Sequence, residues 1–446
     1  MTSPLPDHLA AERGPLIDAT SLLTFYSVLL LAVPSKLVFS PLGGAGTPAQ
    51  VVGVSLAAWY LWVRAQRVTP QDAGSQPVRT AMLCFAATIA ISYVVAMTRT
   101  ISPAEISTSD LAMISLISWL GVVVVANDGI PSLDRLYVLL KRLGALGGAL
   151  ATLGIVQFLT GQQWIDKIQI PGLTATQVFA GVAARDGFNR PAGTAVHPIE
   201  FGVVLTIILP IAITCAMTLK DRNWIRRWYP TLAIATAIPL SISRTAIIGT
   251  IVVLAVLMPT WSRQARHAAL VAVTAMTAAL FLVIPGFVGT FASLFTTIGA
   301  DSSAQSRTDS YQIAFEFVAR SPIVGRGYAT FLPSYWILDN QYLGLLIEIG
   351  ALGLLAFLGL IVTGVLTAVR SRANSDDPVA RQMAQALAAA VVCGAVSTGL
   401  YDLLGFPMSA GLLFLVIGTS GALWRLVRIT PRFTRSSNSL SKHLTR

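Results

Sequence analysis

Long apolar stretches alternate with short polar segments along most of this chain. Twelve of them are long enough to cross a lipid bilayer, if short and tilted spans are allowed. They lie near 20–39, 48–63, 80–97, 111–126, 143–160, 198–219, 228–242, 245–259, 268–284, 341–369, 383–403 and 407–427. The pattern predicts an all-α, polytopic membrane protein with about twelve transmembrane helices.

Composition supports a membrane protein over a set of soluble domains. Hydrophobic residues make up 54% of the chain and charged residues only 11%, whereas a soluble domain has about 25% charged residues. The net charge of +11 then indicates basic loops facing anionic lipid, and no nucleic-acid partner is expected. The three cysteines lie in apolar runs and form neither a disulfide framework nor a metal-binding pair. The polar first 19 residues and the apolar run after them show no cleavage site, so that run is predicted to be retained.

The basic residues orient these spans. With the N-terminus inside, 22 of the 31 Lys and Arg residues fall on the inner side, as the positive-inside rule requires. This predicts a multi-pass protein of the cytoplasmic (inner) membrane with both termini cytoplasmic. The nine outer cations are Lys36, Arg99, Lys167, Arg185, Arg190, Arg244, Arg307, Arg320 and Arg326.

The chain is predicted to form one transmembrane domain over residues 1–429. Two long outer loops, at about 161–197 and 285–340, hold six of the nine outer cations. Loops of this length in a compact protein are usually functional or disordered, and their aromatic and branched residues argue against disorder. The basic, Ser- and Thr-rich segment 430–446 is predicted to be a disordered cytoplasmic tail.

The second outer loop is predicted to contain a short amphipathic helix over 307–320. Ser306 followed by Asp309 resembles a capping box at its start, and Ser321-Pro322 ends it. One apolar stripe follows helical spacing at Tyr311, Ala314, Phe315 and Val318.

A turn and the start of a span follow this helix. Gly325-Arg326-Gly327 predicts the turn, and either Asp339 or Asn340 is expected to cap the next span. The Asp339 carboxylate would then lie at a helix N-terminus near the outer interface.

Several motifs in this half of the chain are similar to those of the O-antigen ligase and O-antigen polymerase superfamily. Arg307 opens a helix that is followed by SPIVGRGYATF and then by DNQYLGLLIEIGALGLLAFLG. Upstream, FNRPAGT at 188–194 with HPIEFG at 197–202 resembles the segment that precedes a span in that superfamily. SISRTA at 241–246 resembles the element between two spans. The resemblance covers residues 185–360 well, and elsewhere it extends only to topology.

The resemblance implies a membrane-embedded glycosyltransferase that acts on the outer (periplasmic) side of the membrane. The donor would be an oligosaccharide linked to a polyprenyl diphosphate, and the acceptor a glycan, a glycolipid or a protein. No nucleotide sugar, cofactor or divalent metal would be needed. Many ligases of this superfamily carry His where this chain has Asp339, which favours a polysaccharide polymerase or an unusual ligase.

Metal-free transfer from a diphosphate needs fixed cations for the leaving group and a base for the acceptor hydroxyl. Arginine grips phosphate oxygens with a two-pronged guanidinium, so Arg190, Arg244 and Arg307 are the predicted diphosphate ligands. Asp339 is the predicted general base. Residues expected to support the site are His197, Asn340, Tyr342 and Arg326.

Structural roles remain open for several of these residues. Arg244 could close a tight turn at the interface, Asp339 could serve only as a helix cap, and His197-Pro198 could simply begin a span. Glu200 and Glu348, inside apolar spans, could bond neighbouring helices. Asp402, in an outer turn, is expected to be structural.

Two other functional classes compete with the transferase. A transporter or a lipid-linked-sugar flippase would also be polytopic, but transporters tend to carry ionisable groups at mid-membrane, whereas the charges here gather on one outer face. A structural assembly protein would leave the clustered arginines without a role. The chain has no phosphate-binding loop, no HExxH and no GxSxG motif.

Overall fold

The computed structural model of the chain is a bundle of α-helices with two short β-sheets. It describes residues 18–66, 74–175, 183–185, 187–218, 223–284, 286, 289 and 302–429, with the side chains of 166, 183–185, 302–309 and 429 outside this description. The predicted tail at 430–446 and much of the outer loop before 302 therefore lie outside the described residues.

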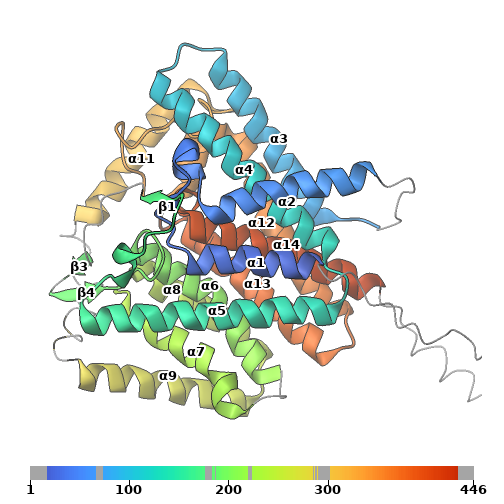
Figure 1. Ribbon diagram of the computed structural model, residues 1–446, viewed down its shortest axis with the longest axis vertical. Coiled ribbons are helices and arrows are strands. Elements are labelled where there is room, and N and C mark those ends of the chain that lie inside the picture. The colour runs from blue at the N-terminus through green and yellow to red at the C-terminus, as the bar shows by residue number, and fades with distance from the viewer. Residues whose placement is uncertain are drawn as a thin grey trace, which may run out of the picture.

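Figure 1 shows how the helices pack side by side, with α11 set obliquely at the left. In chain order they are α1 (Ala19–Ala32), α2 (Pro48–Ala65), α3 (Pro77–Met97), α4 (Pro103–Gly129), α5 (Leu133–Thr160), α6 (Pro198–Thr218), α7 (Trp224–Leu240), α8 (Arg244–Leu257), α9 (Arg263–Val283), α11 (Ser302–Arg320), α12 (Gln341–Asn374), α13 (Pro378–Thr398) and α14 (Pro407–Ile429). Short 3-10 turns are η1 (Ser40–Ala45), η2 (Trp164–Lys167), η3 (Met258–Thr260) and η5 (Leu403–Gly405). The all-α prediction is confirmed.

Each of the twelve predicted apolar stretches coincides with a helix. Eight of these helices are long and apolar enough to cross a membrane: α3, α4, α5, α6, α9, α12, α13 and α14. The other four stretches form α1, α2, α7 and α8, which are shorter or less apolar. The number of twelve spans therefore stays a prediction.

Local sequence accounts for where several helices begin. Thr47 caps α2 and Ser102 caps α4, each in a reciprocal capping box with a Gln or Glu three residues later. Proline follows both caps, where its missing N–H costs nothing.

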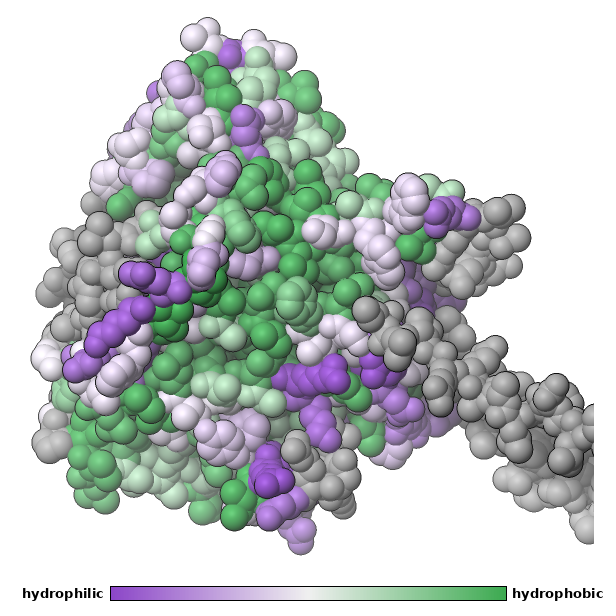
Figure 2. All heavy atoms as spheres, in the orientation of Figure 1, coloured by the Kyte–Doolittle hydropathy of each residue, from purple (hydrophilic) through white to green (hydrophobic). Residues whose placement is uncertain are grey.

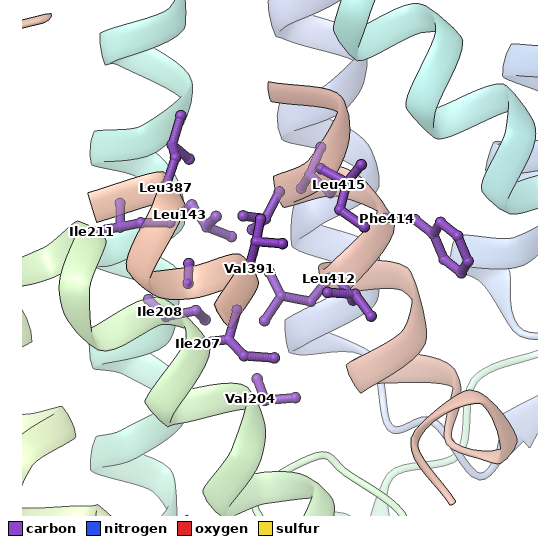
Figure 3. Packing of buried hydrophobic residues seen from close by; sticks show 14 of the residues in the cluster. Leu143, Val204, Ile207, Ile208, Ile211, Leu387, Val391, Leu412, Phe414 and Leu415 are labelled. Carbon is purple, nitrogen blue, oxygen red and sulfur yellow. The ribbon is translucent and has the colours of Figure 1, made fainter. Parts of the chain in front are cut away.

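The core lies where α6, α13 and α14 meet α5 and α12. Its aliphatic side chains interdigitate around Val391 and Leu412 (Figure 3), and fully buried Phe414 belongs to the same core. The Phe414 ring stacks on that of Trp119 with 4.8 Å between ring centroids. Helices approach closely where one residue is small: a Cβ on Gly121 would lie 2.2 Å from the Gly53 carbonyl oxygen, the close backbone packing that membrane helices favour.

Helix α12 is broken at Gly350, although the sequence predicts one continuous span at 341–369. Gly350 has φ 64° and ψ −171°, a conformation that only glycine adopts readily. The break frees the N–H groups of Ala351 and Leu352, which donate to the carbonyls of Pro322 (2.9 Å) and Ile323 (3.0 Å). The loop after α11 is therefore anchored on the kink of α12.

The amphipathic helix of the second outer loop is longer than predicted. Helix α11 begins at Ser302, so Ser306 lies inside it and does not cap it. It ends at Arg320, as Ser321-Pro322 predicts. The apolar stripe is also displaced, because Tyr311 and Phe315 are exposed. Its packed side is made by Ala314, Phe317 and Val318 against Leu343 and Ile347 of α12.

The first outer loop contains strands that the sequence did not predict. β2 (Thr174–Ala175) pairs antiparallel with β1 (Leu37–Val38), and β3 (Ala183–Arg185) pairs with β4 (Phe188–Arg190). On the face shown in Figure 2, hydrophobic side chains cover the middle of the molecule. Hydrophilic ones gather at the left margin, at the upper right and in a group that runs from below the centre to the bottom of the molecule. The strands and α11 lie toward the left margin.

Candidate active site

Four helices begin close together at one end of the bundle. The first turn of α6 touches the start of α8, since a Cβ on Gly202 would lie 2.8 Å from the Ala246 Cβ. The Glu200 carboxylate accepts hydrogen bonds from the Met408 and Ser409 amides, at 2.8 and 3.3 Å, and so joins α6 to the start of α14. Because helix N-termini carry partial positive charge, this arrangement favours an anionic ligand.

The start of α12 joins the same group. Gln341, its first residue, accepts a hydrogen bond from the Leu404 amide at 2.7 Å. The α13–α14 loop thus lies directly against the N-terminus of α12. The same loop reaches α6, because the rings of Phe406 and His197 lie 6.4 Å apart.

The turn between α7 and α8 is strained and holds Arg244. Buried Ile242 has φ 46°, a left-handed conformation that β-branched residues rarely adopt and that costs on the order of 1–3 kcal/mol. Ser243 caps α8 by accepting the Ala246 amide, so Arg244 is the first residue of the helix. Strain of this kind is often found at functional sites.

Arg190 comes to this turn from the end of β4. Its Nε donates to the Ser241 carbonyl at 3.1 Å. The structure therefore brings together Arg190 and the turn that carries Arg244, two of the three predicted diphosphate ligands. Arg307 lies in α11, and its side chain is outside the description.

His197 lies just before α6 and stays neutral. Its Nδ1 accepts a hydrogen bond from the Ile199 amide at 3.1 Å. Burial, together with the positive charges of Arg190 and Lys36, lowers the pKa of His197 to about 4. Because Nδ1 is used as an acceptor, the ring proton is assigned to Nε2, which can donate a hydrogen bond but not accept a proton.

Lys36 is a cation of this region that the sequence reasoning counted only for topology. Its turn is held against the segment before α6, since the Ser35 amide donates to the Thr194 carbonyl at 2.9 Å and the Thr194 hydroxyl donates to the Leu31 carbonyl at 2.6 Å. In the sequence, the only feature that singled out Lys36 was its position as a cation in the first predicted outer turn.

The sequence left open whether Asp339 or Asn340 caps α12, and the structure answers this. The Asn340 side chain accepts the amides of Tyr342 (3.0 Å) and Leu343 (3.4 Å). Asn340 is therefore the cap, and half-buried Asp339 does not have that role. Tyr342, another predicted supporting residue, packs inward and donates its hydroxyl to the Ala395 carbonyl at 2.7 Å.

A second carboxylate, Asp402, lies near Asp339. The pKa of Asp402 is raised to about 6, mainly by burial and in part by the negative charge of Asp339, against the opposing effect of a hydrogen bond from the Gly405 amide. Asp402 was expected to be structural, and the sequence alone could not place it beside Asp339. A buried carboxyl group with a raised pKa near a second carboxylate is a recurring feature of acid–base sites.

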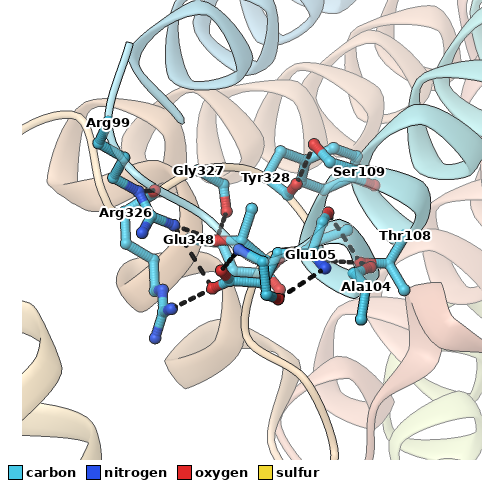
Figure 4. Close-up of polar contacts among 12 residues, drawn as sticks. Arg99, Ala104, Glu105, Thr108, Ser109, Arg326, Gly327, Tyr328 and Glu348 are labelled. Atoms are coloured by element: carbon cyan, nitrogen blue, oxygen red, sulfur yellow. Dashed lines mark hydrogen bonds and ion pairs between the residues drawn. The ribbon is translucent and has the colours of Figure 1, made fainter. Parts of the chain in front are cut away.

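Arg326, predicted to support the site, is instead part of a buried brace (Figure 4). Its guanidinium forms an ion pair with Glu105 at the start of α4, and its side chain is only 16% exposed. Arg99 Nε donates to the Arg326 carbonyl at 2.9 Å. Glu105 was missed by sequence reasoning because it is 221 positions away.

Glu348 completes this brace. Its carboxylate accepts the amides of Ala329 and Phe331, and its carbonyl accepts the Gly327 amide at 2.9 Å. Both intramembrane carboxylates that the sequence singled out, Glu200 and Glu348, therefore bond backbone amides. Among the described residues, no three His, Cys, Asp or Glu side chains are grouped closely enough to hold a metal ion.

Comparison with known proteins found a family that part of this chain resembles. The family model described as O-antigen ligase matches residues 229–358. The match runs from α7 through Arg244 and α11 to the kinked α12, and it confirms the resemblance to the O-antigen ligase and polymerase superfamily. The comparison with curated proteins gave no match.

Proposed function

We propose that this protein is a membrane glycosyltransferase that moves an oligosaccharide from a polyprenyl diphosphate to an acceptor hydroxyl on the outer side of the membrane. The O-antigen ligase match supports glycosyl transfer in general. The observation that carries the specific proposal is the grouping of Arg190 and the Arg244 turn with the start of α12, where Asp339 and Asp402 lie near each other.

The cationic side of the site would hold the leaving group. Arg190, Arg244 and Arg307 would bind the diphosphate oxygens, and the N-termini of α6, α8 and α14 would add partial positive charge. The neutral His197 would donate from Nε2 to a phosphate or sugar oxygen. Fixed donors that match developing charge are usually the largest contribution to such catalysis.

The carboxylate side would activate the acceptor. The acceptor oxygen would bond to the anomeric carbon while the carbon–oxygen bond to the diphosphate breaks, and the leaving oxygen would take that electron pair. The hydroxyl proton would pass to Asp339 as general base. Asp402, whose pKa is raised to about 6, would act on Asp339 through its negative charge or would accept the proton from it.

Deletion of the gene, followed by extraction of lipid-linked sugars, tests this function. A transferase predicts that a polyprenyl-diphosphate oligosaccharide accumulates on the outer leaflet, where it can be labelled on intact cells. Accumulation confined to the inner leaflet would instead indicate a flippase and overturn the proposal.

A further inference from the structure

A second, basic pocket lies beside the loop that follows α11. It has a volume of about 600 Å³, and its lining includes Arg99, Arg320, Arg326, Phe317 and Tyr335. These residues come from the end of α3, the last turn of α11 and the loop before α12. Cavities of this size hold small organic ligands.

The pocket carries excess positive charge. Three guanidinium groups line it, and among the described residues the carboxylate that forms ion pairs with them is Glu105, which bonds Arg326 and lies 3.6 Å from Arg99. In this part of the chain, three guanidinium groups therefore share one ion-paired carboxylate. Within the described part of the chain, exposed Arg320 has no carboxylate partner, and the buried Nε of Arg326 has no hydrogen-bond acceptor.

Aromatic rings hold the arginines in place. The Arg320 guanidinium lies 5.2 Å from the centre of the Phe317 ring, and that of Arg326 lies 5.1 Å from the same ring. Tyr335 covers Arg326 from a second side at 5.0 Å. Stacked guanidinium groups keep their donors oriented, so an anion entering the pocket would find a pre-organised site.

The pocket neighbours the candidate active site but is distinct from it. Glu348 interacts electrostatically with both Arg326 and Asp402, and so lies near both. Arg320 is thirteen residues after Arg307 on α11, about 20 Å along the helix axis. If the reacting end of a glycan lies at Asp339, a sugar several rings farther along the chain could occupy this pocket.

We infer that this pocket is a glycan subsite that binds an acidic sugar, one that carries a carboxylate or a phosphate. The inference rests on the proposed function for its glycan. An anionic lipid headgroup shares the charge, but the pocket, with a volume of about 600 Å³, is larger than a phosphate alone requires. Arg320 is the residue that would contact the anion most freely.

Binding to the full-length protein in phosphatidylcholine nanodiscs tests the inference. The probes are hexagalacturonate, neutral maltohexaose of the same length and inorganic pyrophosphate. We expect wild-type protein to bind hexagalacturonate and not maltohexaose. Arg320→Gln should weaken binding about 10-fold or more, because a charge-assisted fork is lost, and Arg320→Lys should weaken it less. Arg370→Gln, at the exposed inner end of α12, serves as the matched control and should bind as wild type does.

Three outcomes with these probes would overturn the inference. The first is that Arg320→Gln binds hexagalacturonate as tightly as wild type does, and the second is that maltohexaose binds as tightly as hexagalacturonate. The third is that pyrophosphate binds as tightly as hexagalacturonate and its binding also depends on Arg320. Nanodiscs with added phosphatidylglycerol form a further arm, in which full competition by the lipid would assign the pocket to headgroups. The Asp339→Asn variant separates this result from the proposed function, since it should be inactive in transfer yet bind the acidic probe normally.

Discussion

Replacing Glu200 by alanine should destabilise the end of the bundle where α6 and α14 begin. The buried Glu200 carboxylate accepts three backbone amides, from Val196 at 2.8 Å, Met408 at 2.8 Å and Ser409 at 3.3 Å. Each buried donor left without an acceptor costs about 1–3 kcal/mol, so the change should cost on the order of 5 kcal/mol. That is a large part of a typical total stability of about 5–15 kcal/mol.

The Glu200→Gln variant sharpens this prediction. Met408 and Ser409 share one carboxylate oxygen and Val196 uses the other. Glutamine keeps one acceptor oxygen and should satisfy the first pair, while its amide group faces the Val196 donor. The expected loss is then about 1–3 kcal/mol, for one unsatisfied donor.

Unfolding of purified protein in detergent, followed by tryptophan fluorescence during heating and during titration with a denaturing surfactant, measures the effect. The expected order of stability is wild type, then Glu200→Gln, then Glu200→Ala. Glu316→Ala, on the exposed side of α11, is the control and should change stability by no more than about 0.5 kcal/mol. Wild-type stability of Glu200→Ala, or equal losses for the two Glu200 variants, would refute the reasoning.

Three further predictions concern the chemistry. Arg190→Lys should reduce use of the lipid-linked donor at least about 10-fold, because lysine lacks the fork that can bond both Ser241 and a phosphate; steady-state transfer with wild-type efficiency would contradict this. Activity should fall as the pH drops through about 6, because Asp402, with a pKa raised from 3.8 to about 6, gains a proton there. In Asp402→Asn, that acid limb of the pH–rate profile should disappear, and an unchanged limb would exclude Asp402 as its source. A chelator should leave transfer intact. A loss of activity that a divalent metal restores would contradict the idea that fixed cations alone stabilise the leaving diphosphate.

The helices of this fold could largely be predicted from the sequence, because the length of each apolar stretch determines where a helix forms. All twelve apolar stretches became helices, and Ser321-Pro322 ended α11 where proline chemistry requires it. The Gly350 kink could not be predicted from an apolar run that looks continuous. It depends on the loop at Pro322 and Ile323, whose carbonyls replace the broken helical acceptors.

The candidate site was only partly visible in the sequence, because its contacts are long-range. Motif order and topology put Arg190 and Arg244 on one face, and the structure joins them through Ser241. No local pattern could pair Arg326 with Glu105 or place Asp402 beside Asp339, because those contacts depend on how distant helices pack. Capping was ambiguous for a similar reason, since Asp339 and Asn340 are both good caps by residue type.

The most direct test of the central claim is glycosyl transfer by purified Asp339→Asn protein. The donor would be the lipid-linked oligosaccharide extracted from the deletion strain, incorporated with the enzyme into liposomes, and the release of polyprenyl diphosphate would be measured. The account predicts that wild-type protein releases it and that Asp339→Asn, folded as judged by its unfolding curve, is slower by about 10²–10⁴-fold. Wild-type turnover by Asp339→Asn would contradict the account.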